Sequence, residues 1–488
     1  MSQKTSLAVG HFPDASICRV QDIYYMVCSS FQYFPALPIF QSTDLIQWQP
    51  ICYGLSQIHV NALIPQTKSI HGIRYPTLRH NQGKFYLLAT LTEYNQHFLL
   101  STDDPIGSWN TPVQVKGDAQ RASLFFDKDN RAYCVFSTGS SASICEINLE
   151  TGDHLSEETV IWKAEDGHFL HAPHLYHIDD AYTLLATTNQ IGGEKLVTLL
   201  TSPTINGNYK PDRVQSPLLD QNTGLLLHVD HAIEIIDTAD GGQIALYQPF
   251  DSNANSHLGS IIHIASLSGD LPSINKADDA ELAPDEHRDD FVLPELQLEW
   301  QFIRQTPDDS EWSVEDRAGW LRLSGSDHTL NSTETPLFVA HKQRHGQCKI
   351  ATTIDFEPQR GQEEAGLAIY VDENHHYEIA VTSLSENTRS VIVRRKIGSL
   401  SAIVAYENIP LNGLLQLIVS ANNWSYNFSY QLLDAEEKQL ATGEAHYLSQ
   451  AVTGLQSGVY FGVYATGNGR KSTTDAFFDW VDYIPIML

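Results

Sequence analysis

The first half of the chain repeats one pattern of apolar and polar positions five times. Each copy is an apolar run, a polar turn, and a second apolar run that ends in small polar residues. Such a copy is typical of a β-hairpin, because Asp, Gly or Asn occupies the turn. The copies begin roughly 45 to 60 residues apart, which is the period of a propeller blade with its loops. The five predicted hairpins are Ser16–Val20 with Tyr24–Ser30, Pro76–Arg79 with Phe85–Thr90, Ala122–Phe126 with Tyr133–Thr138, Pro173–Tyr176 with Tyr182–Thr187, and Ala232–Ile236 with Ile244–Gln248.

The chain is therefore predicted to be all-β, with two domains. Five hairpin units favour a five-bladed β-propeller over residues 1–268, since radial repetition protects the edges of the sheets. Residues 269–289 are acidic and rich in turn residues, as in a linker. From Asp290 to the end of the chain, alternating strands return at Lys349–Phe356, Gly366–Val371 and His376–Thr382, which predicts an antiparallel β-sandwich over residues 290–488.

Polar and aromatic residues precede the first strand of every hairpin. In a hairpin, the start of the first strand and the end of the second lie at the same end, so these positions ring one mouth of the propeller channel. A ring of charged and aromatic side chains in such loops favours a binding pocket over ordinary solvated loop ends. The ring contains Asp14, Arg74, Tyr75, Arg121, His171, Asp230 and His231, and Glu93 and Asp251 follow second strands at the same mouth.

Composition excludes some partners. The chain has 488 residues, with 30 Lys and Arg against 59 Asp and Glu, and a formal net charge of −29. This charge argues against nucleic acid and against an anionic membrane surface. The six cysteines show no CxxC or zinc spacing and are predicted to be buried free thiols. No apolar signal segment opens the chain and no span reaches membrane length, so we expect a cytoplasmic protein, which agrees with free thiols.

Several phrases resemble glycoside hydrolase family 43, in particular its β-xylosidase and arabinofuranosidase branch. The N-terminal phrases are His11–Val20 and Ser29–Leu45, the second of which contains Phe31. The second half is similar to the lectin-like, concanavalin-like sandwich of the same enzymes at Ala365–Leu367, Asn374–Tyr377, Tyr464–Gly469 and Phe478–Trp480. The resemblance spans nearly the whole chain and implies a propeller followed by a concanavalin-like sandwich.

The resemblance also implies a mechanism. The family cleaves terminal pentosides with inversion, using a general base and a general acid about 6.5–9.5 Å apart, with a third carboxylate that tunes the acid. Asp14 matches the base. The position of the third carboxylate holds Arg121, and the position of the acid holds His171. Two further positions depart from the family pattern, since Arg74-Tyr75 replaces Trp-Ala and Leu258-Gly259-Ser260 lacks the final Arg.

These departures lead to a first hypothesis of an atypical exo-acting hydrolase of short oligosaccharides. Arginine matches carboxylate and sulfate groups in bidentate geometry, so the new cations favour a substrate with a uronate, an unsaturated uronate or a sulfated unit. Asp14 would be the base and His171 the acid, or Glu93 or Asp251 would supply a relocated acid. The predicted substrate-binding residues are Phe31, Arg74, Tyr75, Glu93, Asp230, His231 and Asp251. The alternative is that each arginine pairs with a pocket carboxylate such as Asp14, Glu93 or Asp230.

Two other functions stay open on the sequence. A lyase or dehydratase would eliminate or hydrate at a uronate, with Arg74 or Arg121 neutralising the carboxylate and His171 or Tyr75 moving a proton. The third hypothesis is a catalytically inactive carbohydrate-binding protein.

Metal, cofactor and partner expectations come mainly from the resemblance. It implies a structural calcium ion at Asp290 and Asp479, a central ion or water at His174, and no required cofactor. The spacing of three between His171 and His174 is only a weak metal signal on strands and loops. The expected partner is an oligosaccharide substrate, and the resemblance also implies a homo-oligomer.

Overall fold

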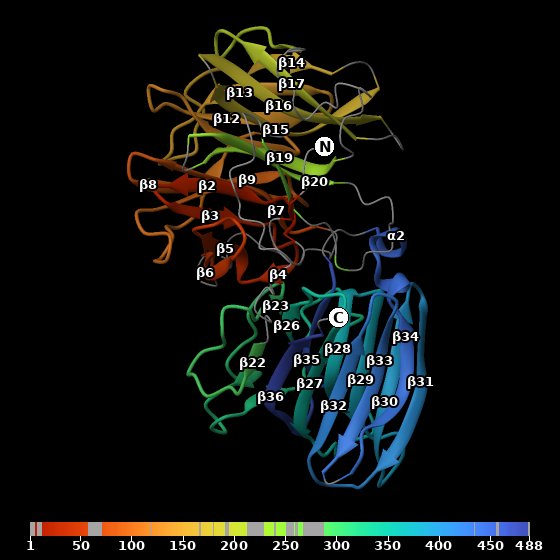
Figure 1. Cartoon of the computed structure of the whole chain (residues 1–488). Coiled ribbons are helices and arrows are strands. Elements are labelled where there is room, and N and C mark those ends of the chain that lie inside the picture. The colour runs from red at the N-terminus through yellow and green to blue at the C-terminus, as the bar shows by residue number, and fades with distance from the viewer. Residues whose placement is uncertain are drawn as a thin grey trace.

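The computed structural model describes residues 5–6, 12–56, 71–117, 119–164, 167–178, 180–190, 195–211, 229–238, 241–249, 258, 262–266, 287–433, 435–454 and 458–486. Two β-domains are joined end to end in the chain (Figure 1). The first contains five four-stranded antiparallel sheets, and the second contains two larger sheets. The predicted all-β fold is therefore confirmed.

Each four-stranded sheet is one blade of a propeller, and all five predicted hairpins form its inner strands. The blades are β2 (Ser16–Val20), β3 (Ile23–Val27), β5 (Ala36–Ser42) and β6 (Gln49–Leu55); β7 (Ile73–Asn81), β8 (Lys84–Leu91), β9 (Gln96–Thr102) and β10 (Val113–Val115); β11 (Arg121–Phe126), β12 (Ala132–Thr138), β13 (Ser141–Glu146) and β14 (Thr159–Lys163); β15 (His168–Ile178), β16 (Ala181–Gln190), β17 (Lys195–Ser202) and β18 (Lys210–Pro211); and β19 (Val229–Asp237), β20 (Gln243–Pro249), β21 (His263–Ser266) and β1 (Thr5–Ser6).

The innermost strands close a ring. Strand β2 contacts β7, then β11, β15 and β19 follow in turn, and β19 contacts β2 again. The N-terminal strand β1 completes the last blade by pairing with β21, with Thr5 opposite Ile264. A ring of five inner strands leaves no gap between the first and last blades, as expected for a propeller.

The second domain is a sandwich of an eight-stranded and a six-stranded sheet. The eight-stranded sheet contains β22 (His287–Asp289), β24 (Trp312–Ser313), β25 (Leu321–Ser324), β27 (Cys348–Asp355), β32 (Leu415–Ala421), β33 (Ser425–Leu432), β34 (Lys438–Glu444) and β36 (Asp475–Pro485). The six-stranded sheet contains β26 (Phe338–Lys342), β28 (Glu364–Asp372), β29 (His375–Thr382), β30 (Arg389–Ile397), β31 (Leu400–Ile409) and β35 (Tyr460–Thr466). Two short helices, η1 (Ala445–Leu448) and α2 (Gln450–Thr453), precede β35.

The six-stranded sheet has an apolar face, which packs on the other sheet, and a second face that points away from it. In β29, Tyr377, Ile379 and Val381 belong to the apolar core between the sheets. The intervening residues face the other way, because successive strand residues point to opposite sides. His376 and Glu378 therefore lie on the face turned away from the second sheet.

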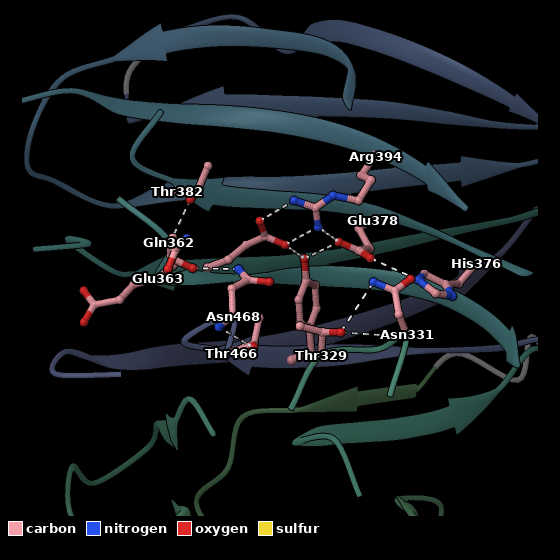
Figure 2. A network of polar contacts seen from close by, with 12 residues as sticks. Thr329, Asn331, Gln362, Glu363, His376, Glu378, Thr382, Arg394, Thr466 and Asn468 are labelled. Carbon is pink, nitrogen blue, oxygen red and sulfur yellow. Dashed lines mark hydrogen bonds and ion pairs between the residues drawn. The ribbon is translucent and has the colours of Figure 1, made fainter. Parts of the chain in front are cut away.

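That face carries a buried ionic network (Figure 2). The Arg394 guanidinium donates to both oxygens of Glu364 at 2.6 and 2.7 Å and also contacts Glu378. The Tyr464 hydroxyl lies 2.6 Å from Glu364 and 2.9 Å from Glu378, and Nε2 of His376 lies 3.2 Å from Glu378. Burial alone would raise the pKa of Glu378, but the positive charge of Arg394 and the nearby ring of His376 lower it. The charges of the network thus neutralise one another, and the network connects four adjacent strands, β35, β28, β29 and β30.

A loop of the first blade joins the two domains. Strand β4 (Tyr33–Phe34) pairs with β23 (Phe302–Ile303) of the second domain, and the Arg304 amide donates to the Gln32 carbonyl at 2.6 Å. The Tyr33 ring stacks on Tyr460 with centroids 3.5 Å apart. Because the same loop carries Phe31 at the propeller mouth, the sandwich supports one wall of the candidate site.

The six cysteines are free thiols, and all except Cys52 are buried, as the sequence predicted. Neither of the two described helices has the length and apolarity needed to span a membrane.

Candidate active site at one mouth of the propeller

Register shifts mark the start of three inner strands. They fall between Arg74 and Thr77 in β7, between His171 and His174 in β15, and between His231 and Glu234 in β19. In β7 and β15 a proline lies inside the irregular stretch, and proline has no N–H for the ladder. A bulge redirects the side chains beside it, so these three blades turn their first residues toward the mouth.

Asp14 is the carboxylate at this mouth. Its residue is only 3 % exposed, and its Oδ2 accepts a hydrogen bond of 2.6 Å from the Ser29 hydroxyl. The Tyr75 amide donates to the same hydroxyl at 3.0 Å. Ser29 therefore links the carboxylate of blade one to the start of blade two.

Three non-glycine residues here adopt left-handed backbone conformations. The φ angles are 50° at Asp14, 51° at Phe31 and 54° at Tyr75. Gly72 makes the Phe31 conformation accessible, since a Cβ at this glycine would lie 2.0 Å from the Phe31 carbonyl oxygen. Left-handed residues other than glycine are uncommon and concentrate at functional sites, which supports a functional role for this mouth.

Arg74 pairs with the candidate base. Its Nε and Nη2 each lie 3.4 Å from Oδ2 of Asp14. The guanidinium also lies between two rings, 4.5 Å from the Phe31 centroid and 4.6 Å from that of Tyr75. The sequence left open whether the arginines bind an acidic substrate or pair with a carboxylate of the pocket. Arg74 does the second, because it pairs with Asp14.

Arg121 lies beyond Tyr75. Its guanidinium carbon is 3.9 Å from the Tyr75 ring centroid, and its Nη2 donates to the Tyr75 hydroxyl at 2.8 Å. Within the described part of the chain, Arg121 forms no ion pair with a carboxylate. Phe31, Arg74, Tyr75 and Arg121 thus form an alternating cation–aromatic ladder across the mouth.

His171 lies near the start of β15, the inner strand of the fourth blade. It is half-buried and lies opposite Thr187. Ser137 connects it to Arg121, because Ser137 is the register partner of Arg121 and its hydroxyl donates to the carbonyl of Leu170 at 2.6 Å. The positions of the substituted acid and of the substituted third carboxylate are therefore neighbours.

The structure describes the remaining predicted pocket residues only in part. Glu93 follows β8, near Gly72, whose carbonyl accepts the Thr92 amide at 3.0 Å. Oε2 of Glu93 is buried and has no hydrogen-bond partner among the described residues. The backbones of Asp230 and His231 lie in β19, but their side chains are outside the described residues, as is the whole of Asp251.

A buried polar cluster fills the channel beneath the mouth, and sequence reasoning missed its two main charges. Glu234 is 1 % exposed and accepts hydrogen bonds from Arg79 at 3.1 Å, Ser16 at 2.8 Å and Tyr176 at 3.1 Å. The sequence signal for Glu234 was a carboxylate flanked on both sides by apolar residues, in the run Ala232–Ile236. We call these residues, with His174, the channel plug.

His174 belongs to this plug. Its Nδ1 lies 3.6 Å from Glu234, and burial lowers its pKa to about 4. Across the described residues, no group of three or more His, Cys, Asp or Glu side chains has a geometry suited to a metal. The central ion at His174 stays a prediction.

The expected calcium residues have other partners. Arg288 binds Asp290 at 2.8 Å and Asp482 at 3.0 Å. Burial raises the pKa of Asp479, and the charge of Asp290 adds to that effect, although Arg288 opposes it. Arg288 thus pairs with Asp290, and among the described residues no group of three or more His, Cys, Asp or Glu side chains is arranged to hold a metal ion. The calcium ion at Asp290 and Asp479 stays a prediction.

The fold and the mouth together define a class. A buried carboxylate and arginines stacked on aromatic rings at one mouth of a propeller are features of a site for a small polar ligand. The attached sandwich has the lectin-like topology. Comparison with known proteins narrows this class.

Residues 7–267 match the family described as "Glycosyl hydrolases family 43", and residues 288–484 match the "Beta xylosidase C-terminal Concanavalin A-like domain". The chain is 29 % identical to the non-reducing end alpha-L-arabinofuranosidase BoGH43B of Bacteroides ovatus, over 99 % of this chain and 95 % of that protein. It is 25 % identical to xylosidase/arabinosidase 43B of Humicola insolens, over 98 % and 96 %.

Solved structures agree. The Bacteroides ovatus xyloglucan GH43B structure matches with a TM-score of 0.86 and 28 % identity, over 99 % of this chain and all of that one. The protein belongs to glycoside hydrolase family 43 and is a propeller–sandwich member of it. The resemblance found in the sequence is confirmed.

Proposed function

We propose that the protein is an exo-acting glycosidase that removes terminal sugars, of the pentose class, from short oligosaccharides carrying a uronate or a sulfate group. The observation that carries the acidic preference is Arg121, a half-buried cation at the mouth without a carboxylate partner in the described structure. The relatives named above are an arabinofuranosidase and a xylosidase/arabinosidase, which supports a pentose as the released sugar.

The channel plug favours attack at a chain end. Arg79, Glu234 and Tyr176 fill the axis beneath the mouth with buried hydrogen-bonded groups. A sugar therefore enters from one side and cannot thread through the propeller. A pocket of this kind accepts the end of an oligosaccharide more readily than its middle.

Asp14 is proposed as the general base. A hydroxyl donor and a guanidinium on one oxygen favour the ionised carboxylate. The carboxylate would take a proton from a water molecule whose oxygen attacks the anomeric carbon, as in inverting hydrolysis.

His171 is proposed as the general acid. Imidazole titrates near neutral pH, so a half-buried histidine can hold a proton and deliver it to the leaving oxygen. The glycosidic C–O bond then breaks as the new C–O bond forms. The neighbouring guanidinium of Arg121 would favour proton release, because a nearby positive charge disfavours imidazolium.

Arg121 is proposed as the anchor for the acidic group. Its ring contact with Tyr75 fixes the guanidinium plane, and a fixed guanidinium matches carboxylate or sulfate by two parallel hydrogen bonds. Hydrolysis is supported by the glycosidase relatives, and elimination at a uronate gains no support from them. The free thiols also support the proposal of a reducing, cytoplasmic setting.

The test is product analysis by mass spectrometry in water enriched in oxygen-18. A panel would pair neutral pentose oligosaccharides with matched ones that carry a uronate or a sulfate. We expect release of a terminal sugar bearing one heavy oxygen, faster from the acidic members. An unlabelled unsaturated product would overturn hydrolysis, equal rates on both sets would overturn the acidic preference, and binding without turnover would favour a carbohydrate-binding protein.

A further inference from the structure

Tyr75 and Arg121 are joined by two contacts at the candidate active site. Nη2 of Arg121 donates to the Tyr75 hydroxyl at 2.8 Å, and the guanidinium carbon lies 3.9 Å from the centroid of the Tyr75 ring. Both residues stand where the sequence departs from the family pattern, Tyr75 in place of an alanine and Arg121 in place of a carboxylate. The two departures are therefore in direct contact, and together they change the chemistry of the mouth.

The Tyr75 hydroxyl still has its own proton to donate. A phenol can accept one hydrogen bond and donate another. The hydroxyl accepts from Arg121, and within the described part of the chain it donates to no acceptor. Because Tyr75 is half-buried rather than enclosed in a core, a ligand at the mouth can meet this proton.

Two cations strengthen this donor. The guanidinium carbon of Arg74 lies 4.6 Å from the centroid of the same ring that Arg121 contacts. A hydroxyl that accepts from a charged donor also donates more strongly, because hydrogen bonds in a chain polarise one another. The acceptor that gains most from a strong O–H donor is an oxyanion, since hydrogen bonds to charged oxygen are the stronger ones.

The backbone holds the phenol in place. Tyr75 has a φ angle of 54°, and its amide donates to the Ser29 hydroxyl at 3.0 Å. The same hydroxyl donates to Asp14 at 2.6 Å, so the position of Tyr75 is tied to that of the proposed base. A donor that is already fixed loses little conformational entropy when a ligand binds.

We propose that Tyr75 is a specificity-determining residue, whose hydroxyl donates to the same carboxylate or sulfate group as Arg121. The assignment rests on the function proposed above, because it supplies a second donor for the acidic group of that substrate. A neutral sugar offers no charge to either donor. The pair therefore discriminates acidic from neutral substrates more strongly than Arg121 would alone.

The test is the ratio of kcat/KM for an acidic substrate to kcat/KM for its neutral analogue, measured in Tyr75→Phe. Phenylalanine keeps the ring that contacts both arginines and removes only the hydroxyl. We expect the ratio to fall about tenfold, the effect of removing one hydrogen bond to a charged group. Tyr86→Phe, near the other end of the same blade, is the matched control and should leave the ratio unchanged.

The same substitution in an Arg121→Gln background separates direct contact from an indirect effect. No arginine is left there for Tyr75 to position, so a hydroxyl that acts only through Arg121 has no further effect. We expect Tyr75→Phe to lower the ratio again in this background, by about threefold or more, because the hydroxyl itself meets the anion.

Two arms, with a uronate-bearing and a sulfated substrate, identify the anion, since the larger fall in the ratio marks the group that Tyr75 contacts. If the unsubstituted protein has no acidic preference, the proposed function fails and the role of Tyr75 fails with it. If the preference is present but survives in Tyr75→Phe, only the role of Tyr75 is overturned. The same conclusion follows if Tyr75→Phe has no further effect in the Arg121→Gln background.

Discussion

Arg74 and Asp14 form an ion pair in which two guanidinium nitrogens lie 3.4 Å from one carboxylate oxygen. The pair sits where a base is needed, and the arginine is held between the rings of Phe31 and Tyr75. Arg74 therefore fixes the position of the proposed base, Asp14. Its guanidinium is already paired with Asp14 when no substrate is bound. Arg121, one ring further along the ladder, is the cation that we propose binds an acidic sugar.

Replacing Asp14 by Asn tests the base. The amide keeps the shape but cannot take a proton from water, so we expect kcat to fall about 10²–10⁴-fold, the usual contribution of general base catalysis. KM should change little, because the side chain volume is retained. Steady-state kinetics on the best substrate of the panel measures this. Ser29→Ala, which removes one hydrogen bond to Asp14, is the milder comparison, and a fully active Asp14→Asn would remove Asp14 from the mechanism.

Replacing Arg121 by Gln tests the acidic preference. Removal of a hydrogen bond to a charged group typically costs about 1.5–3 kcal/mol of interaction free energy. We therefore expect kcat/KM for a uronate-bearing substrate to fall about 10–100-fold, while kcat/KM for the neutral analogue is nearly unchanged. Arg121→Lys keeps the charge and should retain part of the preference. An equal loss on both substrates would instead assign Arg121 to holding Tyr75.

A double change tests what the departures from the family pattern do. Arg121→Asp with His171→Glu places carboxyl groups at the two positions where the family resemblance implies them. We expect this variant to gain activity on neutral terminal pentosides and to lose the acidic preference, measured with chromogenic pentosides and with the uronate panel. Each single change leaves one cation beside one carboxyl group, so neither should gain as much. No gain in the correctly folded double variant would mean that the mouth has diverged beyond these two positions.

The five hairpins were predictable because their apolar runs alternate with period two and their turns carry Asp, Gly or Asn. The same periodicity located Asp14, Arg74, Tyr75, Arg121 and His171 at the starts of blades. It did not show that Arg74 would turn onto Asp14, since a sequence gives the strand position of a residue and not the direction of a long side chain.

Two other features, strand β1 and the pair of Glu234 with Arg79, could not be predicted from the sequence for related reasons. Strand β1 has only two residues, too few to show a period, yet it closes the fifth blade. Glu234 and Arg79 lie within predicted inner strands, and their pairing joins residues 155 positions apart. Tertiary contacts of that range leave no local signal. The bulges beside Pro76 and Pro173 were readable in principle, because proline cannot donate to the ladder.

Tyr33→Ala tests the link between the domains. The substitution removes the ring that stacks on Tyr460, and truncation of a buried aromatic side chain typically costs about 3–5 kcal/mol. We expect a lower midpoint of chemical unfolding and a higher KM, because the loop also carries Phe31. Tyr33→Phe is the matched control. The Tyr33 hydroxyl is buried without a hydrogen-bond partner among the described residues, so its removal should be close to neutral. Normal stability in Tyr33→Ala would mean that the stack does not hold the domains together.

Two buried histidines should make the propeller sensitive to acid. Burial lowers the pKa of His97 to about 4 and that of His174 to about 4. In the unfolded chain each of these histidines has a pKa of about 6.5. Between pH 6.5 and 4 the unfolded state therefore binds protons that the folded state does not, so the free energy of unfolding falls as the pH falls through this window. The slope is up to about 1.4 kcal/mol per pH unit for each histidine.

His97→Gln isolates one of these contributions. His97 is fully buried, and its Nδ1 lies 2.9 Å from the Thr90 hydroxyl, a partner that a glutamine side chain can retain. We expect the variant to lose stability at pH 7 but to show a shallower decline between pH 6.5 and 4 in urea unfolding. His446→Gln, at an exposed position in the sandwich, should leave the pH dependence as it is. If His97→Gln and the unsubstituted protein decline in parallel, His97 is not neutral in the folded state or it ionises without unfolding the propeller.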